Sequence, residues 1–367
     1  MRITFTCNNL NNGGAERVIC NLANQMVKDG FDVRIICLKV MPSFYYPLDD
    51  KVEVIEIDKK NTTRKSFVKR KIIGILNLYK LIQSIKGSTC VISFYSRQNC
   101  YSILACRLLN IKIICSERDH FFLNDGKVNE ILRRIFYPLS DGFIHQTNWA
   151  QCYLRQHCNI RCRDVVIHNP LWITEFPERT PQKGYILSVG RLDKQKNYSG
   201  LINAFAEVHK VLPYTSLHIF GEGPLKEQLK KQCLDLGIQD SVVFEGISKN
   251  IVKEYVKADI FTLFSHGEGY PNVLLEALAL GVPSIASDSP VGGPREMIEN
   301  NVNGLLIPCS DEKTLADSIL YLLQNDERKN RFSSKSISIR ETNEFKKIYN
   351  QIMDYILGVV DESIPYK

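Results

Sequence analysis

Residues 260–280 read IFTLFSHGEGYPNVLLEALAL, and this stretch decides the fold more than any other. Four of its first five residues are apolar and predict a buried parallel strand, whereas its last eight predict a helix. The turn between them holds two glycines and a proline, and it leads into a helix N-terminus, which together make an anion-binding corner. Two carboxylates, Glu268 and Glu276, lie beside this corner. Carboxylates in that position are best explained by hydroxyl groups attached to the anion, as in a nucleotide-sugar.

Strand-like and helix-like segments alternate on both sides of this stretch, which predicts parallel sheets covered by helices. An aperiodic segment with three prolines, Pro170, Pro177 and Pro181, interrupts the pattern and suits a linker. The sequence therefore predicts an α/β protein with two doubly wound domains that face each other. The expected ranges are a first domain at 1–168, a linker at 169–184 and a second domain at 185–340, with a helix at 342–358 that could pack back on the first domain. Strands are expected at 3–7, 31–38, 52–57, 90–94, 111–116, 142–145 and 164–168, and then at 185–189, 216–220, 241–245, 260–264, 283–287 and 304–307.

The composition is that of a globular protein long enough for two domains: 367 residues, 44% of them hydrophobic and 24% charged. None of the twelve cysteines forms a CxxC pair, and their spacing matches no zinc pattern, so no metal site is expected. Free thiols and the lack of a secretory signal favour a reduced, cytoplasmic protein. No apolar run approaches the ~20 residues that span a bilayer.

Positive charge is concentrated in the first half of the chain. Residues 1–180 hold 26 Lys/Arg against 16 Asp/Glu, and the segment 59–86 alone holds nine basic residues and no acidic one. Apolar residues recur at helical spacing in the second part of this segment. A basic amphipathic helix can lie on an anionic membrane, although a solvated helix with one face in the core remains the alternative. Nucleic acid is not expected as a partner, because no nucleic-acid-binding module is present.

Two further glycine-rich turns carry groups that suit a diphosphate. Arg191 and Lys196 follow the strand expected at 185–189, and cations in such a loop meet phosphate oxygens. In the first domain, Gly13 and Gly14 stand at a helix start, where backbone comes close to a ligand or simply turns. The GxGxxG fingerprint of dinucleotide-binding proteins does not follow the first strand, and GxxxxGK[ST] does not occur.

The ordered set of motifs resembles the retaining GT-B glycosyltransferases of family 4, in particular bacterial enzymes that extend lipid-linked oligosaccharides. The resemblance covers nearly the whole chain and implies the GT-B fold, two Rossmann-like domains with the active site in the cleft. The matching motifs are Gly13-Gly14-Ala15-Glu16-Arg17, Gly190-Arg191 with Lys196-Asn197, Phe244-Glu245-Gly246, the pair Glu268 and Glu276, Gly281-Val282-Pro283, Gly293-Pro294-Arg295-Glu296, and Asn303-Gly304-Leu305.

The resemblance implies a role for each matching position. Arg191 and Lys196 would hold the donor diphosphate and neutralise it as a leaving group, Glu276 would bind the ribose, and Glu268 would face the donor sugar. No general base and no metal ion is then required. Further donor contacts are implied for Gly14, for Gly246 and Ile247 at the base, and for the backbone N–H groups near Gly269, Tyr270, Asn272 and Val273. His120 would either face the donor sugar and acceptor or be a surface-loop histidine.

The expected function is transfer of a hexose or N-acetylhexosamine from a UDP-sugar, with a lean toward UDP-GalNAc, to a polyprenyl-diphosphate-linked glycan. The UDP-sugar is a substrate, and no cofactor is expected. Such an enzyme of surface glycan assembly would be cytoplasmic and peripheral on the inner face of the cell membrane. Two alternatives stay open: a nucleotide-sugar epimerase on the same fold, and a catalytically inactive nucleotide-sugar-binding partner protein.

Overall fold

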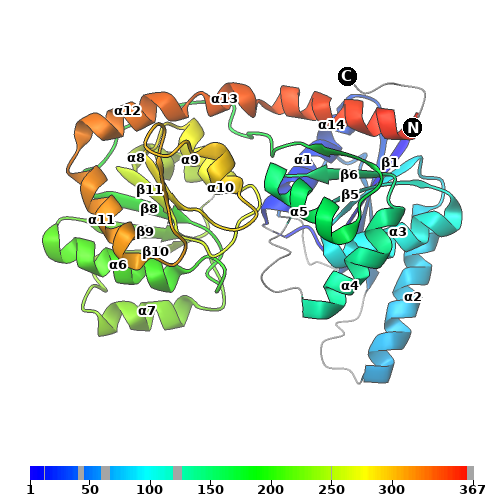
Figure 1. The fold of residues 1–367 in the computed structure, drawn as a ribbon, viewed down its shortest axis with the longest axis horizontal. Helices are drawn as coiled ribbons and strands as arrows, with labels where there is room; N and C mark the ends of the chain where they lie inside the picture. Colours follow the sequence, from blue (N-terminus) through cyan, green and yellow to red (C-terminus); the bar gives the residue numbers. More distant parts are fainter. Residues whose placement is uncertain (12, 40–44, 59–66, 119–125, 249, 362–367) are drawn as a thin grey trace. The chain divides into compact units, whose positions relative to one another are not determined.

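The computed structural model describes residues 1–11, 13–39, 45–58, 67–118, 126–248 and 250–361; of Asp58 and residues 67–72 it describes only the backbone (Figure 1). The chain divides into two compact units. Unit 1 comprises Met1–Pro170 and Lys346–Lys367, and unit 2 comprises Leu171–Phe345.

Unit 1 contains a seven-stranded parallel sheet in the order β3-β2-β1-β4-β5-β6-β7. Its strands are β1 (Arg2–Cys7), β2 (Asp32–Lys39), β3 (Glu53–Asp58), β4 (Cys90–Phe94), β5 (Lys112–Ser116), β6 (Gly142–His145) and β7 (Arg163–Val166). Its helices are α1 (Gly14–Lys28), α2 (Phe67–Ile85), α3 (Ser96–Leu109), α4 (Gly126–Phe136), the 3-10 helix η1 (Tyr137–Leu139) and α5 (Asn148–Cys158). The central strands are buried on both faces, as the continuous apolar runs of a covered parallel sheet require.

The last helix, α14 (Phe345–Val360), completes unit 1 although it lies at the other end of the sequence. The hydroxyl of Tyr355 accepts a hydrogen bond from the backbone N–H of Phe143 at 2.8 Å and donates one to the carbonyl of Arg163 at 2.5 Å. The hydroxyl of Tyr349 donates to the Asp29 carboxylate, just beyond the end of α1, at 2.5 Å. These contacts hold α14 on the sheet that the first half of the chain builds.

Unit 2 contains a six-stranded parallel sheet in the order β10-β9-β8-β11-β12-β13. Its strands are β8 (Tyr185–Val189), β9 (Ser216–Phe220), β10 (Val242–Gly246), β11 (Ile260–Leu263), β12 (Ser284–Ser287) and β13 (Leu305–Ile307). Its helices are α6 (Tyr198–Val211), α7 (Lys226–Asp235), α8 (Ile251–Lys257), α9 (Asn272–Ala279), α10 (Gly293–Met297), α11 (Glu312–Leu323), α12 (Asp326–Ser336) and α13 (Ile339–Thr342).

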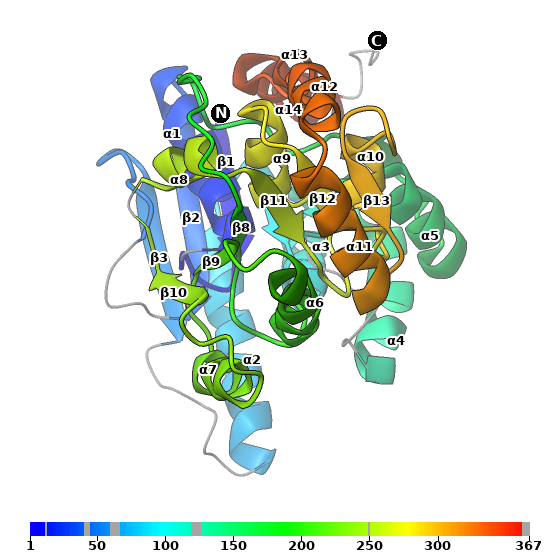
Figure 2. The same ribbon diagram turned by 90° about the vertical axis from the view of Figure 1, so that its left-hand side faces the viewer.

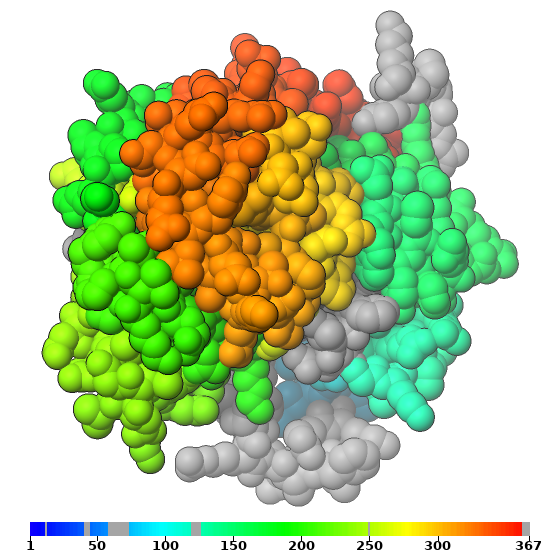
Figure 3. All heavy atoms as spheres, turned by 60° about the vertical axis from the view of Figure 1, so that its left-hand side comes forward, coloured from blue at the N-terminus to red at the C-terminus, as the bar shows by residue number. Residues whose placement is uncertain are grey.

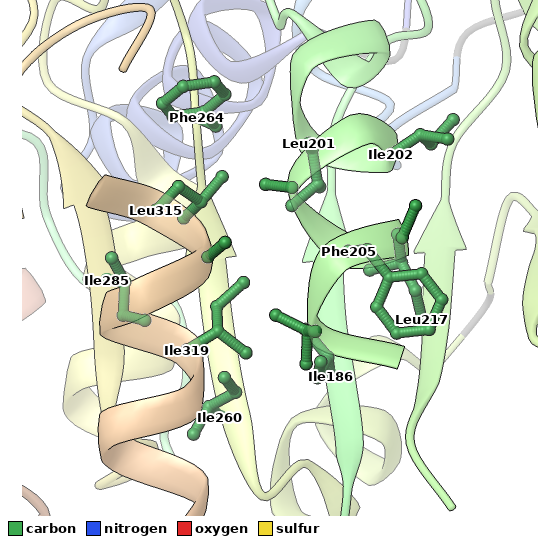
Figure 4. Packing of buried hydrophobic residues seen from close by; sticks show 14 of the residues in the cluster. Ile186, Leu201, Ile202, Phe205, Leu217, Ile260, Phe264, Ile285, Leu315 and Ile319 are labelled. Carbon is green, nitrogen blue, oxygen red and sulfur yellow. The ribbon is translucent and has the colours of Figure 1, made fainter. Parts of the chain in front are cut away.

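Each face of this sheet has its own hydrophobic core, because the strand order runs in one direction from β8 to β10 and in the other from β11 to β13, so right-handed crossovers place the helices of the two halves on opposite faces. On one face, α6 and α11 lie side by side and bury Phe205, Leu315 and Ile319 against the strands (Figures 2 and 4). Helices α11 and α12, in orange, form the outer surface over this core (Figure 3). The other face is covered by α8, α9 and α10.

The two doubly wound sheets predicted from the sequence are confirmed, and the ends of the expected strands shift by at most two residues. The segment expected as a linker, 169–184, is grouped mainly with unit 2. Residues 171–184 belong to unit 2, because Leu171 is buried and its N–H donates to the Asn343 carbonyl at 2.7 Å, while the N–H groups of Thr180 and Gln182 donate to α8. Aperiodic sequence therefore marks a docked segment here. None of the described helices is long and apolar enough to span a bilayer.

Candidate functional site

The predicted site residues of unit 2 gather at the carboxyl ends of β8 and β11. These two strands are paired neighbours at the centre of the sheet, although β9 and β10 lie between them in the sequence. The strand order reverses at this point, and a parallel sheet binds its ligands where the order reverses. The loop 190–197 follows β8, and the loop 264–271 follows β11.

An ion pair joins the two loops. The Nζ of Lys196 lies 2.5 Å from Oε1 of Glu268, and both side chains are largely buried. Two hydrogen bonds flank this pair: the side-chain amide Nε2 of Gln195 donates to the carbonyl of Gly267 at 2.8 Å, and the backbone N–H of His266 donates to the carbonyl of Gln195 at 2.8 Å. The sequence predicted separate roles for Lys196 and Glu268, whereas the structure brings them together as partners.

Arg191 lies in the same loop as Lys196 but is exposed. Its Nε lies 2.5 Å from Oδ2 of Asp193, and the other oxygen of that carboxylate accepts the backbone N–H of Lys196 at 3.2 Å. The Asp193 carboxylate thus contacts both Arg191 and Lys196 and holds them in one loop. A guanidinium carries five donors in a fixed fork, so Arg191 can hold Asp193 with one edge and present another edge to phosphate oxygens.

The turn after β11 is fixed by the loop after β12. A Cβ atom built on Gly293 would lie 1.7 Å from the carbonyl oxygen of Gly269, so only glycine permits this close approach. The N–H of Glu268 donates to the carbonyl of Pro290 at 3.4 Å. Val291 adopts φ 77°, a left-handed conformation that is strained for a β-branched residue. Strain held in place at the carboxyl ends of the strands indicates a turn whose shape is required.

Glu276 and the predicted backbone donors belong to α9. Glu276 is buried in the second turn of the helix. Asn272 and Val273 are the first two residues of the helix, where backbone N–H groups point along the axis toward a bound anion. Gly269 precedes the helix in the turn. These positions are compatible with the predicted contacts to ribose, sugar and phosphate, which stay predictions.

The side chain of Tyr270 has a structural role. It is buried, burial raises the pKa of its hydroxyl, and the hydroxyl accepts a hydrogen bond from Nδ2 of Asn343 at 3.0 Å. Only the backbone of Tyr270 is therefore placed for the predicted donor contact. Gly246 and Ile247 stand at the carboxyl end of the edge strand β10, where the Gly246 carbonyl accepts the N–H of Gly221 at 2.7 Å and Ile247 is exposed.

In unit 1, the glycine-rich turn leads directly into α1, with Gly13 as the cap and Gly14 as the first helical residue. The structure adds a residue that sequence reasoning missed. The hydroxyl of Tyr95 donates to Oε1 of Glu16 in this motif at 3.0 Å, and Tyr95 adopts φ 77° and ψ 144°. Its position directly after the strand expected at 90–94 was the only available signal. His120 lies outside the described residues.

Sequence reasoning also missed a buried polar cluster at the end of β5. The Glu117 carboxylate accepts hydrogen bonds from the hydroxyls of Ser96, at 2.8 Å, and Tyr137. Burial and the adjacent carboxylate raise the pKa of Tyr137. Arg133 of α4 donates to Ser96 at 3.0 Å and is itself buried. The cluster connects α3 and α4 to the carboxyl end of β5.

The chain matches two family descriptions: "Glycosyltransferase Family 4" over residues 12–171 and "Glycosyl transferases group 1" over residues 173–338. Each match falls largely within one of the two units.

Two relatives come from Campylobacter jejuni. One is named "GalNAc-alpha-(1->4)-GalNAc-alpha-(1->3)-diNAcBac-PP-undecaprenol alpha-1,4-N-acetyl-D-galactosaminyltransferase"; it is 32% identical over 89% of this chain and 90% of its own length. The other is named "N-acetylgalactosamine-N,N'-diacetylbacillosaminyl-diphospho-undecaprenol 4-alpha-N-acetylgalactosaminyltransferase"; it is 27% identical over 95% of this chain and 97% of its own length.

Solved structures of the same fold include TarM from S. aureus, crystallised with UDP, with a TM-score of 0.80 and 15% identity over 98% of this chain and 99% of that one. Another is HepE from Anabaena in complex with UDP, with a TM-score of 0.76 and 18% identity over 98% of this chain and 100% of that one. With its two Rossmann-like sheets and its two family matches, the chain belongs to the family 4 glycosyltransferases of the GT-B fold.

Proposed function

We propose that the protein is a retaining, metal-independent hexosyltransferase that moves a hexose or N-acetylhexosamine from a UDP-sugar to a polyprenyl-diphosphate-linked glycan. The observation that carries the proposal is the convergence of Arg191, Lys196 and Glu268 at the switch point of the unit 2 sheet. Relatives named for N-acetylgalactosaminyl transfer and for undecaprenyl-linked substrates support UDP-GalNAc as the donor and a lipid diphosphate as the acceptor anchor.

The chemistry that these residues supply is stabilisation of the leaving group. Negative charge builds on the UDP diphosphate as the glycosidic bond breaks, and the Arg191 guanidinium, the Lys196 ammonium and the N-terminus of α9 meet that charge. These groups are placed before the reaction begins, so little reorganisation is needed when the charge develops. In a front-face mechanism the leaving phosphate accepts the proton of the acceptor hydroxyl, so neither Glu268 nor Glu276 needs to act as a base.

The Lys196–Glu268 pair gives Glu268 a second task. A carboxylate 2.5 Å from the ammonium fixes the lysine while the site is empty of donor. When the diphosphate arrives, Lys196 can share its three protons between Glu268 and a phosphate oxygen. Glu268 then holds the lysine in position and offers its second oxygen to a hydroxyl of the donor sugar.

The proposal is tested with purified protein, an undecaprenyl-diphosphate-linked oligosaccharide and a panel of UDP-, GDP- and ADP-sugars. Release of UDP that requires both a UDP-sugar and the acceptor supports transfer, and the anomeric coupling constant of the product reports retention. Conversion of the UDP-sugar without acceptor would instead identify an epimerase. Binding of UDP with no turnover for any acceptor would identify a non-catalytic binding protein. Activity that persists in EDTA supports the metal-independent mechanism, and activity lost in EDTA and restored by a divalent cation argues against it.

The same proposal places the protein on the inner face of the cell membrane through the basic segment 59–86. Helix α2 covers most of this segment, and it has no acidic residue. Clusters of Lys and Arg are attracted to anionic lipid at about 1 kcal/mol per residue near the surface. Charge reversal at Lys69, Arg70 and Lys71 tests this membrane attachment. Unchanged vesicle binding would mean that the segment is an ordinary solvated surface.

A further inference from the structure

Helix α4 has its apolar face turned away from the protein. Val128, Ile131 and Ile135 are 67%, 56% and 56% exposed. At 100° per residue these three side chains fall within about 60° of one another, so they form a single ridge. A helix on a globular protein ordinarily turns such a stripe toward the core, so the orientation of α4 calls for an explanation.

The opposite side of α4 explains why the ridge faces outward. Arg133 is 4% exposed and donates to Ser96 at 3.0 Å, within the Glu117 cluster. Asn129, one turn earlier, accepts a hydrogen bond from Arg97 of α3 at 3.4 Å. A buried guanidinium that lost its partners would destabilise the fold strongly. The hydrogen bonds of Arg133 and Asn129 therefore fix the rotation of the helix about its axis, and this rotation places the ridge on the surface.

Further apolar side chains are exposed on neighbouring helices. Leu139 in η1 is exposed just after α4, and Leu108 is 64% exposed on α3, which packs against both α4 and α2. On α2, Ile75 and Tyr79 are exposed one turn apart. Helices α2, α3 and α4 are neighbours in unit 1 (Figure 1). We call the exposed apolar side chains of these three helices the apolar belt.

We propose that the α4 ridge inserts into the interfacial region of an anionic lipid bilayer, with the rest of the apolar belt beside it. The charge on the same helices selects this occupant: the sequences of α2, α3 and α4 hold nine Lys/Arg and a single acidic residue, Glu130. Five of these cations are exposed among the described side chains, namely Lys80, Arg97, Arg107, Lys127 and Arg134. Apolar side chains framed by cations match the boundary between anionic headgroups and acyl chains. A second copy of the chain would bring two positive surfaces together, which is unfavourable.

The inference rests on the proposed lipid-linked acceptor, which would be met at a membrane, and it adds an apolar anchor to the electrostatic one of segment 59–86. The two anchors differ in their response to salt. Attraction between surface cations and lipid headgroups is screened as ionic strength rises, whereas burial of apolar side chains is not. Binding that survives high salt is therefore the signature of the ridge.

The test uses the full-length protein and sedimentation with vesicles that contain phosphatidylglycerol, at low and high salt. The variant Val128→Gln/Ile131→Gln/Ile135→Gln removes the ridge at exposed positions and keeps a helix-forming residue at each. The matched control is Val211→Gln/Leu234→Gln/Leu236→Gln, which changes three exposed apolar residues of unit 2. We expect the ridge variant to partition at least about tenfold more weakly, most clearly at high salt, and the control variant to bind like the native protein.

Equal vesicle binding by the native protein and the ridge variant at both salts would overturn the proposal. So would a native dimer that the ridge variant turns into a monomer, since the ridge would then join two copies. The thermal shift caused by UDP is also measured on the native protein, the ridge variant and the control variant. It distinguishes failure of the membrane anchor from failure of the proposed function. Retained UDP binding with unchanged vesicle binding rejects the anchor alone, whereas loss of UDP binding in the native protein rejects the proposed donor.

Discussion

The ammonium of Lys196 and the carboxylate of Glu268 form a largely buried ion pair at 2.5 Å between residues 72 positions apart in the sequence. The pair joins the two loops that follow the central strands β8 and β11 of unit 2. It is therefore both a structural tie and part of the proposed diphosphate site, and the two roles can be measured separately.

Breaking one side of this pair should damage both roles. Lys196→Met leaves the Glu268 carboxylate buried without its partner, which costs about 3 kcal/mol of unfolding free energy. The double variant Lys196→Met/Glu268→Leu should recover most of that stability, because it leaves no buried charge. Both variants should lose at least about 100-fold in kcat, since the leaving group loses a preplaced cation.

Urea unfolding and initial rates on the same preparations check this prediction. Lys230→Met, which opens an exposed ion pair with Glu227, is the matched control and should change neither quantity appreciably. A double variant with native turnover would show that the pair is only structural.

Tyr95 should act as a positioning residue for the glycine-rich turn of unit 1. Tyr95→Phe removes the hydroxyl that donates to Glu16 and should lower stability by about 1.5–3 kcal/mol, the usual range for a hydrogen bond to a charged group. If the turn contacts the donor, KM for the UDP-sugar should rise while kcat changes little. Tyr79→Phe removes an exposed hydroxyl and provides the control. A stability loss without any change in KM would confine Tyr95 to a structural role.

Gly293→Ala should be disruptive because its new Cβ would collide with the carbonyl oxygen of Gly269. The turn after β11 would have to move, at a cost of about 3 kcal/mol or more, and donor binding should weaken with it. Gly74→Ala is the matched control, since a Cβ there meets nothing within 4 Å inside helix α2. That change should raise stability by about 0.5–1 kcal/mol. Thermal unfolding of the two variants checks the contrast.

His145 should make unit 1 less stable in mild acid. Burial lowers the pKa of its ring, and the hydrogen bond to Asp164 at 2.9 Å only partly opposes this. Below about pH 6.5 the unfolded chain binds a proton at this position and the folded chain does not, so stability falls with pH until the folded pKa is reached. In His145→Gln the loss of stability between pH 7.5 and pH 5.5, measured in urea, should shrink. An unchanged loss would mean that other groups cause it.

Asp164 acts in a lower pH range. Burial alone would raise its pKa, but the hydrogen bonds from His145 and Arg155 outweigh burial and bring the pKa to about 2. Its contribution to stability is complete above the unfolded pKa of about 4 and is lost as the pH falls toward 2. Asp164→Asn should therefore remove this acid-labile contribution, whereas the His145 variant should retain the part that comes from Arg155. A second unfolding series between pH 4 and pH 2 distinguishes the two variants.

The strand–turn–helix units were predictable because their signals are local. The apolar run at 260–264 and the glycines after it specify strand and turn without help from the rest of the chain. The Lys196–Glu268 pair was not predictable as a pair, since it depends on β8 lying next to β11 in the sheet. The left-handed backbone of Tyr95 has no sequence signal, because tyrosine does not favour it. The buried side chain of Tyr270 was hidden by its place inside a ligand-binding motif.

Helix α4 shows a different limit. Its apolar spacing alone would place Val128, Ile131 and Ile135 toward the core. The buried hydrogen bonds of Arg133 decide the opposite rotation, and they involve Ser96 on another helix. A polar contact distant in sequence thus overrides a strong local pattern.

The return of α14 to unit 1 has a consequence for biosynthesis. The seven described strands of unit 1 have all been synthesised once residue 166 is added, yet the helix that covers Phe143 and Arg163 is made only with residues 345–360. Domains usually fold as they emerge, N-terminal first. Here the first unit must wait uncovered while the whole of unit 2 is synthesised, so a chain stopped before residue 345 should be a target for chaperones and proteases even though unit 2 is nearly complete.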